Sequence, residues 1–219
     1  MPQIGCSTTI RLPTESLRAT TDPFSPSSRR SQTASRSSDS DDATETAEDD
    51  PLSALNSLGA TPLDLIAYRH TSRNRPPLSG RGAQALGGRW NRRGRSATIY
   101  LTDSVPGCAA EFRRMAAGQG RGSSALLPRA LRHVHLDQMP LVDLAVPGAL
   151  DALGLSRDDI RAADWSKCQL IGETAALAGY AGLRAPSATG IGHAIVLFED
   201  RLPEGRVHLV KTEDLSPYL

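Results

Sequence analysis

The sequence predicts an α+β fold, in which helices and strands are mixed, behind an N-terminal segment without a globular pattern. Three observations predict this fold. Stretches with strand composition and stretches with helical periodicity follow one another without regular β-α-β alternation. The last two predicted strands are separated by a short Leu-Pro-Glu-Gly turn, so they are expected to run antiparallel. The apolar residues are concentrated after residue 51, in a stretch long enough to bury one core.

The first 51 residues are predicted to be a disordered tail. Residues 1–50 contain 18 serines and threonines. Their charges are segregated, with arginines up to Arg36 and then an acidic block from Asp39 to Asp50. Such a composition buries too little apolar surface to offset about 1–2 kcal/mol of backbone entropy per residue. We therefore place a single domain at residues 52–219.

Several short segments have the composition of strands. The third of them alternates two histidines with Val134 and Leu136, which is typical of a half-buried strand. The last two are expected to form a hairpin. The predicted strands cover residues 63–68, 97–101, 132–137, 141–144, 194–199 and 206–211.

Three helices are predicted from the signals at their ends. Ser104 suits the N-cap position, and Pro106 the first turn, of a helix that runs to about residue 117. Ser156 and Asp159 have the spacing of a capping box and begin a second helix. The third helix, at residues 166–178, is amphipathic and ends at a glycine.

The composition excludes several classes of protein. Lys and Arg number 25 against 24 Asp and Glu, so the chain lacks the positive charge of a dedicated nucleic-acid binder. The longest apolar run, Ala194 to Phe198, is far shorter than the roughly 18 residues that span a membrane. The three cysteines are scattered without CxxC spacing, which argues against a disulfide framework or a zinc site. We expect a soluble cytoplasmic protein.

Residues that could carry chemistry crowd into positions 68–111. Aromatic residues make up 4% of the chain, yet Tyr68, Trp90 and Tyr100 all lie here. Each also has an ordinary structural explanation, because buried strands use tyrosines and cores use tryptophan. The arginines near Trp90 could form a solvated loop, and Glu111 could pair with an arginine at the edge of its helix. Taken singly, these residues decide nothing.

Taken together, these segments resemble the RES domain, a family named for Arg, Glu and Ser positions in its sequence. The resemblance spans about residues 65–211, which is nearly the whole predicted domain. After Ser187, the Gly-Ile-Gly-His sequence departs from the Asn-containing ending of the family. The motifs that carry the resemblance are Tyr68-Arg69, Gly87-Gly88-Arg89-Trp90-Asn91, Ile99-Tyr100-Leu101, Ala109-Ala110-Glu111, Cys168-Gln169 and Leu183-Arg184-Ala185-Pro186-Ser187-Ala188.

The resemblance implies a bacterial toxin of a RES–Xre toxin–antitoxin system. Its fold would be similar to the ADP-ribosyltransferases, with small antiparallel or mixed sheets flanked by helices. RES proteins cleave the nicotinamide–ribose bond of NAD by hydrolysis or phosphorolysis, and some transfer ADP-ribose to a protein. NAD is then a substrate, and neither a cofactor nor a metal is implied. The partner would be an antitoxin with an Xre-type helix-turn-helix region. Inorganic phosphate and a homo-oligomer stay open, whereas direct contact with nucleic acid or membrane is not expected.

The family's functional positions carry residue types that suit NAD cleavage. A carboxylate stabilises the oxocarbenium-like ribosyl cation, and a guanidinium binds the diphosphate with two hydrogen bonds. A tyrosine offers a ring face to nicotinamide and a hydroxyl to ribose. The serine can bind the ribose or orient the carboxylate. The matching residues are Arg69, Tyr100, Glu111 and Ser187, and further candidates for substrate binding are Arg89, Trp90, Asn91 and Gln169.

Other functions stay open at the level of sequence. The protein could be a nucleic-acid-directed toxin of the RNase type or an RNA binder. In that case the segment from Gly88 to Arg95 would contact the nucleic acid, with Trp90 stacking on a base and the arginines holding phosphates. The domain could also be a catalytically silent binding module. A metal enzyme is disfavoured, because His133 and His135 share a strand face but lack a clear third ligand.

Overall fold

Residues 50–219 are the part of the chain that the computed structural model describes, so the tail predicted at residues 1–51 lies almost entirely outside them. Within the described part, the first helix begins at Pro51, one residue before the predicted domain boundary. The side chain of Asp50 caps this helix by accepting a hydrogen bond from the Leu52 N–H at 3.2 Å. No helix in this part of the chain is both long and apolar enough to cross a membrane.

Six strands form one sheet in the order β1-β2-β5-β4-β3-β6. Because β1 also pairs with β3, the first five strands of this order close into a ring, and β6 lies outside the ring on β3. All pairs are antiparallel except β3 with β4. The strands are β1 (Ala60–Ser72), β2 (Thr98–Thr102), β3 (Arg129–Asp143), β4 (Gly182–Pro186), β5 (His193–Phe198) and β6 (Val207–Asp214).

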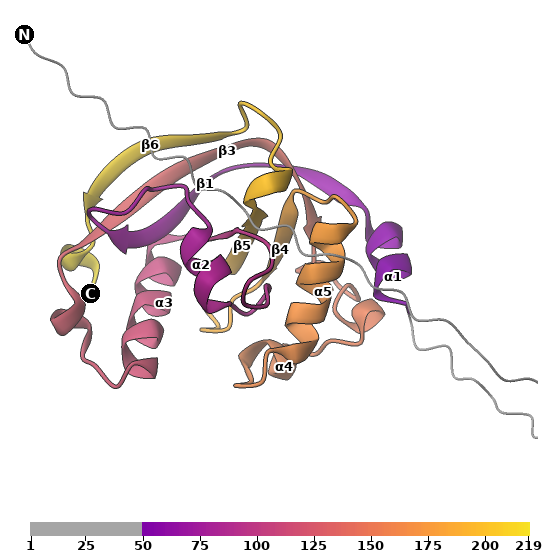
Figure 1. Cartoon of the computed structure of the whole chain (residues 1–219), viewed down its shortest axis with the longest axis horizontal. Coiled ribbons are helices and arrows are strands. Elements are labelled where there is room, and N and C mark those ends of the chain that lie inside the picture. Colours follow the sequence, from indigo (N-terminus) through magenta and orange to yellow (C-terminus); the bar gives the residue numbers. More distant parts are fainter. Residues whose placement is uncertain (1–49) are drawn as a thin grey trace, which may run out of the picture. The chain divides into compact units, whose positions relative to one another are not determined.

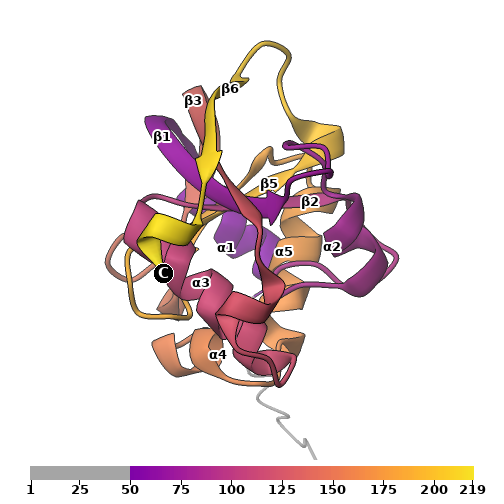
Figure 2. The ribbon, with the colours of Figure 1, turned by 90° about the vertical axis from the view of Figure 1, so that its left-hand side faces the viewer.

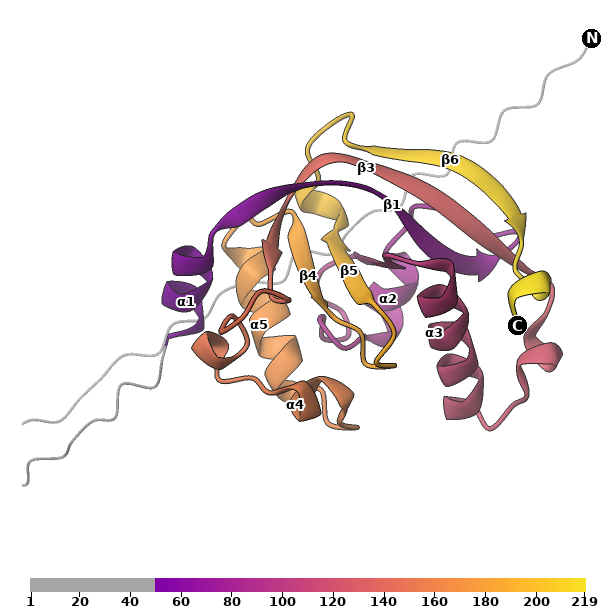
Figure 3. The ribbon, with the colours of Figure 1, turned by 180° about the vertical axis from the view of Figure 1, so that it is seen from behind.

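The long strands β1, β3 and β6 form an arch, and the short strands β4 and β5 lie beneath it (Figure 1). The helices α3 and α5 stand on either side of β4 and β5 under the same arch (Figure 3), and Figure 2 looks at the molecule from the α3 end. The helices are α1 (Pro51–Leu58), α2 (Arg81–Leu86), α3 (Val105–Gly118), α4 (Arg157–Arg161) and α5 (Ser166–Leu177).

The strand β5 joins two parts of the core, because its successive side chains point to opposite faces. Ile195 and Leu197 are fully buried and pack with apolar residues of β1, β2 and β3. Val196 and Phe198 are buried on the other face, in the cluster that includes Ile171 of α5. The helix α3 is held separately, through a cluster that contains Phe112 and Leu131.

The three predicted helices are confirmed, and so are the start signals of the first two. The Ser104 hydroxyl caps α3 by accepting from the Gly107 N–H at 3.2 Å. Both bonds of the predicted capping box are present at α4, where the Asp159 N–H donates to Ser156 at 3.1 Å and the Ser156 N–H donates to Asp159 at 2.8 Å. The third predicted helix corresponds to α5. The short helices α1 and α2 were not predicted.

Two strand predictions are wrong in their arrangement. The segments predicted at residues 132–137 and 141–144 belong to one continuous strand, β3, which passes through Gln138 at a φ of 44°. One strand forms because β1 pairs along the whole of it, and an irregularity between Leu63 and Leu65 absorbs the local distortion.

The predicted C-terminal hairpin is also wrong, since β5 pairs with β2 and β4 while β6 pairs with β3. The physical reason is burial. A strand buried on both faces needs neighbours on both edges, and β5 from Ile195 to Phe198 is buried throughout. In contrast, Leu209 and Val210 of β6 are 41% and 60% exposed, which suits a strand at the edge.

Candidate active site

A cavity of about 860 Å³ opens between α3, the Gly87–Trp90 segment and the ends of β1, β2 and β4. This volume lies in the range of small-molecule and cofactor sites. The residues that line the cavity include Arg69, His70, Gly88, Arg89, Trp90, Tyr100, Glu111, Arg114, Met115 and Trp165. Five of the predicted site residues therefore line the same cavity: Arg69, Arg89, Trp90, Tyr100 and Glu111.

Ser187 orients the carboxylate of Glu111. Its hydroxyl donates to Glu111 Oε1 at 2.9 Å, and the serine is only 4% exposed. The Ser187 hydroxyl oxygen lies 2.7 Å from the Thr189 hydroxyl and accepts a hydrogen bond from the Thr189 N–H at 3.1 Å. Because the serine proton is committed to Glu111, the Thr189 hydroxyl is the donor in the contact between the two hydroxyls. Of the two roles predicted for Ser187, the geometry favours orientation of the carboxylate.

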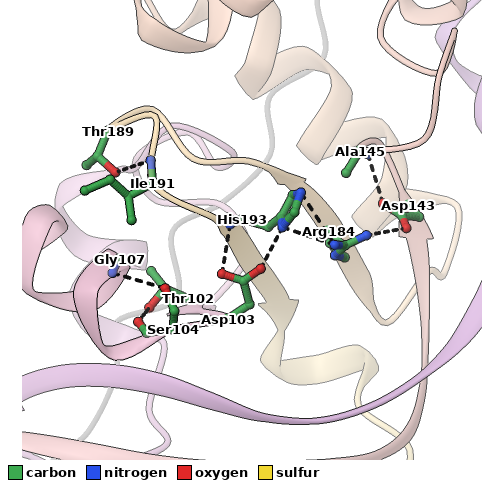
Figure 4. A network of polar contacts seen from close by, with 10 residues as sticks. All are labelled: Thr102, Asp103, Ser104, Gly107, Asp143, Ala145, Arg184, Thr189, Ile191 and His193. Carbon is green, nitrogen blue, oxygen red and sulfur yellow. Dashed lines mark hydrogen bonds and ion pairs between the residues drawn. The ribbon is translucent and has the colours of Figure 1, made fainter.

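The loop that carries Ser187 is tied to the sheet by a polar network (Figure 4). The loop closes where the Ser187 N–H donates to the Gly192 carbonyl at 3.1 Å. The next residue, His193, donates its N–H to Asp103 Oδ1 at 3.0 Å and places its Nδ1 2.6 Å from Asp103 Oδ2. Gly192 has a φ of +61°, and a side chain there would overlap Asp103, so only glycine fits the approach.

The network continues from His193 to two further charged residues. Arg184 of β4 lies 3.1 Å from His193 Nδ1 and donates to Asp143 Oδ2 at 2.7 Å (Figure 4). This network links the strands β2, β5, β4 and β3 through Asp103, His193, Arg184 and Asp143. Four strands are therefore tied to the loop that holds Ser187.

The hydroxyl of Tyr100 holds the Gly-Gly-Arg-Trp-Asn segment in place. It accepts from the Trp90 N–H at 2.9 Å and donates to Asn91 Oδ1 at 2.8 Å. Asn91 in turn donates to the Ala83 carbonyl at 2.9 Å, and Gln169 donates to the Gly88 carbonyl at 3.0 Å. Burial raises the pKa of Tyr100, so the hydroxyl stays protonated and remains a donor.

These contacts separate the residues of that segment into two groups. Trp90 and Asn91 are 1% and 2% exposed, and Asn91 and Gln169 do not line the cavity. Tyr100 borders the cavity, while its hydroxyl is engaged by the protein. Direct contacts of Asn91 and Gln169 with a substrate therefore stay predictions, and the contacts seen are those that fix the backbone around Arg89.

Arg69 and Arg89 both line the cavity and both bond to backbone carbonyls. Arg69 donates to Pro77 O at 3.0 Å and to Ser79 O at 2.9 Å. Arg89 donates to Ala162 O at 3.1 Å, and its guanidinium lies 5.3 Å from the centre of the Trp165 ring. Burial lowers the pKa of each arginine, although a guanidinium remains protonated at neutral pH. The diphosphate role predicted for Arg69 stays a prediction.

Two polar residues of the cavity were missed by the sequence reasoning. His70 lies 2.9 Å from an Arg129 nitrogen, and burial lowers its pKa to about 3, so its imidazole is neutral and accepts that hydrogen bond at Nδ1. Arg114 lies one helical turn after Glu111 on α3. The spacing of three residues was a readable signal, because positions i and i+3 share a helix face.

The residues that suggested a metal enzyme or an RNA binder make contacts within the protein. His133 lies 2.5 Å from Glu213 and His135 lies 3.2 Å from Asp64. Within residues 50–219, no group of three or more His, Cys, Asp or Glu is placed to hold a metal ion. In the arginine cluster proposed for RNA, Arg92 and Arg95 both pair with Glu173, at 2.9 and 3.0 Å. Part of that positive charge is therefore neutralised within the protein.

Comparisons with known proteins find related sequences and a related structure. The RES domain model matches residues 65–217. Proteins named NAD(+) phosphorylase MbcT, from Mycobacterium bovis and from two strains of Mycobacterium tuberculosis, are 35% identical over 167 residues, covering 75% of this chain and 90% of theirs. The crystal structure of the M. tuberculosis MbcT–MbcA toxin–antitoxin complex contains a similar chain, with a TM-score of 0.73 and 30% identity. The similarity covers 78% of this chain and 95% of that chain.

Proposed function

The chain belongs to the RES domain family, and on this basis we propose that it consumes NAD by phosphorolysis of the nicotinamide–ribose bond. The observation that carries the proposal is the Ser187–Glu111 pair, whose hydrogen bond of 2.9 Å holds a carboxylate beside a cavity of about 860 Å³. The similarity to proteins named NAD(+) phosphorylase supports phosphate, rather than water or a protein side chain, as the acceptor.

The proposed reaction needs stabilisation of positive charge on the ribose. A phosphate oxygen forms a bond to the ribose C1 atom while the bond from C1 to nicotinamide breaks. The electron pair of the broken bond returns to the pyridinium ring and neutralises it, so the leaving group needs no proton. The products are nicotinamide and ADP-ribose 1-phosphate. Glu111 stabilises the ribosyl cation, and Ser187 keeps the carboxylate in the correct direction.

The remaining site residues are assigned by the same proposal. Tyr100 contributes its ring face beside the nicotinamide, because its hydroxyl is engaged by Trp90 and Asn91. Arg69 and Arg89 provide positive charge for the diphosphate. The segment that carries Arg89 is held in position by Trp90, Asn91 and Gln169.

The proposed biological setting is a toxin–antitoxin system. The likeness to the MbcT chain of a toxin–antitoxin complex supports an antitoxin as the partner, and we assign it to the Xre type with a helix-turn-helix region. The fold is proposed to be ADP-ribosyltransferase-like, with NAD as a substrate and no bound cofactor. The cytoplasm is the proposed location because it holds both NAD and phosphate.

The test is to incubate the purified protein with NAD in the presence and absence of phosphate and to separate the products. We expect release of nicotinamide and formation of ADP-ribose 1-phosphate only when phosphate is present. Glu111→Gln should lower the rate by about 10²–10³-fold, the range for one preorganised electrostatic group. Glu173→Gln is the matched control, since Glu173 pairs with Arg92 and Arg95 and does not line the cavity.

Three outcomes would contradict parts of the proposal. Intact NAD after long incubation with the unmodified protein would favour a silent binding module. Free ADP-ribose at equal rates with and without phosphate would mean hydrolysis. Transfer of label from NAD to a protein would mean an ADP-ribosyltransferase.

A further inference from the structure

Arg114 is placed on the same helix face as Glu111 and reaches the same cavity. It follows Glu111 by three residues in α3, so the two Cβ atoms lie about 5–6 Å apart. Both residues line the cavity, and Met115 lines it beside them. Arg113, the preceding residue, is exposed and bonds instead to the carbonyl of Tyr218 at 3.2 Å.

Arg114 and Arg89 are brought together by two consecutive carbonyl groups. Arg89 donates to Ala162 O at 3.1 Å, and Arg114 donates to Arg161 O at 3.4 Å. These carbonyls lie where the chain leaves α4, in the segment that passes between α5 and α3 (Figure 3). Because consecutive Cα atoms are about 3.8 Å apart, both guanidiniums are held at one short stretch of backbone. Each side chain uses one of its five N–H groups there.

The two guanidiniums form no ion pair within the described part of the protein. Within residues 50–219, no carboxylate lies at ion-pair distance from Arg89 or Arg114. The charged residues of the cavity lining are three arginines, with Arg69 the third, and a single carboxylate, Glu111. The pKa of Arg89 is lowered mainly by burial and also by the positive charge of Arg114, while the negative charge of Glu111 raises it by a smaller amount, so the two arginines repel each other. An anion between them would relieve this repulsion.

We propose that Arg89 and Arg114 form a binding subsite for phosphate oxygens on the wall of the cavity, one helical turn from Glu111. This proposal rests on the proposed function, because NAD phosphorolysis brings phosphate groups from two sources. One source is the diphosphate of NAD, and the other is the inorganic phosphate that attacks the ribose. Trp165 supports the subsite, since its ring lies beneath the Arg89 guanidinium.

Steady-state kinetics of Arg114→Ala, with NAD and phosphate varied independently, test the proposal. Loss of a charge-assisted hydrogen bond should raise one KM about 10- to 100-fold. A raised KM for phosphate alone assigns the subsite to the acceptor, and a raised KM for NAD alone assigns it to the diphosphate. Arg114→Lys keeps a point charge without the paired N–H groups and should recover part of the loss.

Arg113→Ala is the matched control, because it removes an arginine from the neighbouring position outside the cavity. It should leave both KM values within twofold of the unmodified protein. Thermal unfolding of all three variants checks that the fold is intact. If Arg114→Ala leaves both KM values and kcat within twofold, the subsite is refuted.

Direct binding separates failure of the subsite from failure of the proposed function. If the unmodified protein releases no nicotinamide, the proposed function fails, and titration calorimetry with ADP-ribose and with inorganic phosphate then decides on the subsite. Binding of either probe that weakens at least 10-fold in Arg114→Ala supports the subsite. Equal binding by both proteins, or no binding of either probe to the unmodified protein, overturns it.

Discussion

A relay of small polar groups determines where the Glu111 carboxylate points. The Ile191 N–H donates to the Thr189 hydroxyl at 3.3 Å, the Thr189 hydroxyl contacts Ser187 at 2.7 Å, and Ser187 donates to Glu111 at 2.9 Å. Each hydrogen bond orients the next group in this series, so the orientation of the carboxylate depends on the whole loop. A carboxylate held by neutral donors keeps its full negative charge for a cationic ribose, whereas a lysine partner would neutralise it.

At the same scale, His70 makes stability depend on pH. Burial lowers its folded-state pKa to about 3, from 6.5 in the unfolded chain. Between these values the unfolded chain binds a proton that the folded protein does not, so stability is fully present above pH 6.5 and falls as the pH drops toward 3. The free energy of unfolding should lose up to about 1.4 kcal/mol per pH unit from this residue.

Denaturant unfolding of the unmodified protein and of His70→Gln, from pH 7.5 down to pH 4.5, measures this contribution. Gln does not titrate, so the variant should lose stability less steeply below pH 6.5. Parallel curves for the two proteins would show that His70 does not cause the dependence.

At the scale of elements, α5 packs directly on the backbone of the Gly-Gly-Arg-Trp-Asn segment. Gly172 of α5 allows this approach, because a Cβ there would overlap the Trp90 carbonyl oxygen. Gln169, one turn earlier, donates to the Gly88 carbonyl of the same segment. The position of Arg89 in the cavity therefore depends on a glycine in a helix that supplies no residue to the cavity itself.

Gly172→Ala should destabilise the fold by about 1–3 kcal/mol, since the overlap is with backbone and the helix must shift. Gly82→Ala is the matched control, because a Cβ at this helical position of α2 meets open space. The control should be neutral or stabilise by about 0.5–1 kcal/mol. Chemical denaturation of both variants checks the prediction, and equal effects would contradict the packing argument.

Local signals explain which elements could be predicted from the sequence. The starts of α3 and α4 follow from Ser104, Ser156 and Asp159, whose capping bonds involve residues at most three positions apart. The partner of a strand is not a local property, so neighbouring β5 and β6 were expected to pair although each pairs elsewhere. The helix α2 is short and contains no buried residue, which leaves no apolar periodicity to detect.

The candidate site was predictable to a similar extent. The resemblance supplied Arg69, Tyr100, Glu111 and Ser187, and the structure brings Glu111 and Ser187 into contact. The resemblance could not predict the contacts of the Tyr100 hydroxyl within the protein, because the Trp90 N–H and the Asn91 side chain come close to that hydroxyl only after folding. Arg114 was missed because its charge alone does not distinguish it from Arg113, and only the helix phase relative to Glu111 does.

At the scale of the whole molecule, the described fold begins with α1, whose cap is Asp50. The family match begins at residue 65. A chain of residues 50–219 should therefore unfold at the same temperature as the full chain and release nicotinamide at the same rate. Thermal unfolding and the NAD assay check this expectation.

A deeper truncation, to residues 60–219, is the control for that experiment. It removes α1, whose Leu55 side chain is fully buried and whose Leu55 carbonyl accepts from Tyr180 at 3.2 Å. Loss of a buried leucine alone costs about 2–5 kcal/mol, so this chain should be clearly less stable. A loss of activity already in the chain of residues 50–219 would instead give the first 49 residues a role in the reaction.

The central place of β5 has a consequence for protein synthesis. This strand is the fifth of six along the chain, yet it lies between β2 and β4, and its first residue, His193, anchors the loop of Ser187. Ribosomes deliver the chain from its N-terminus. A nascent chain that stops before β5 cannot close the ring of strands or fix Ser187 against Glu111. We therefore expect a chain that stops before β5 to lack the activity proposed for the cavity.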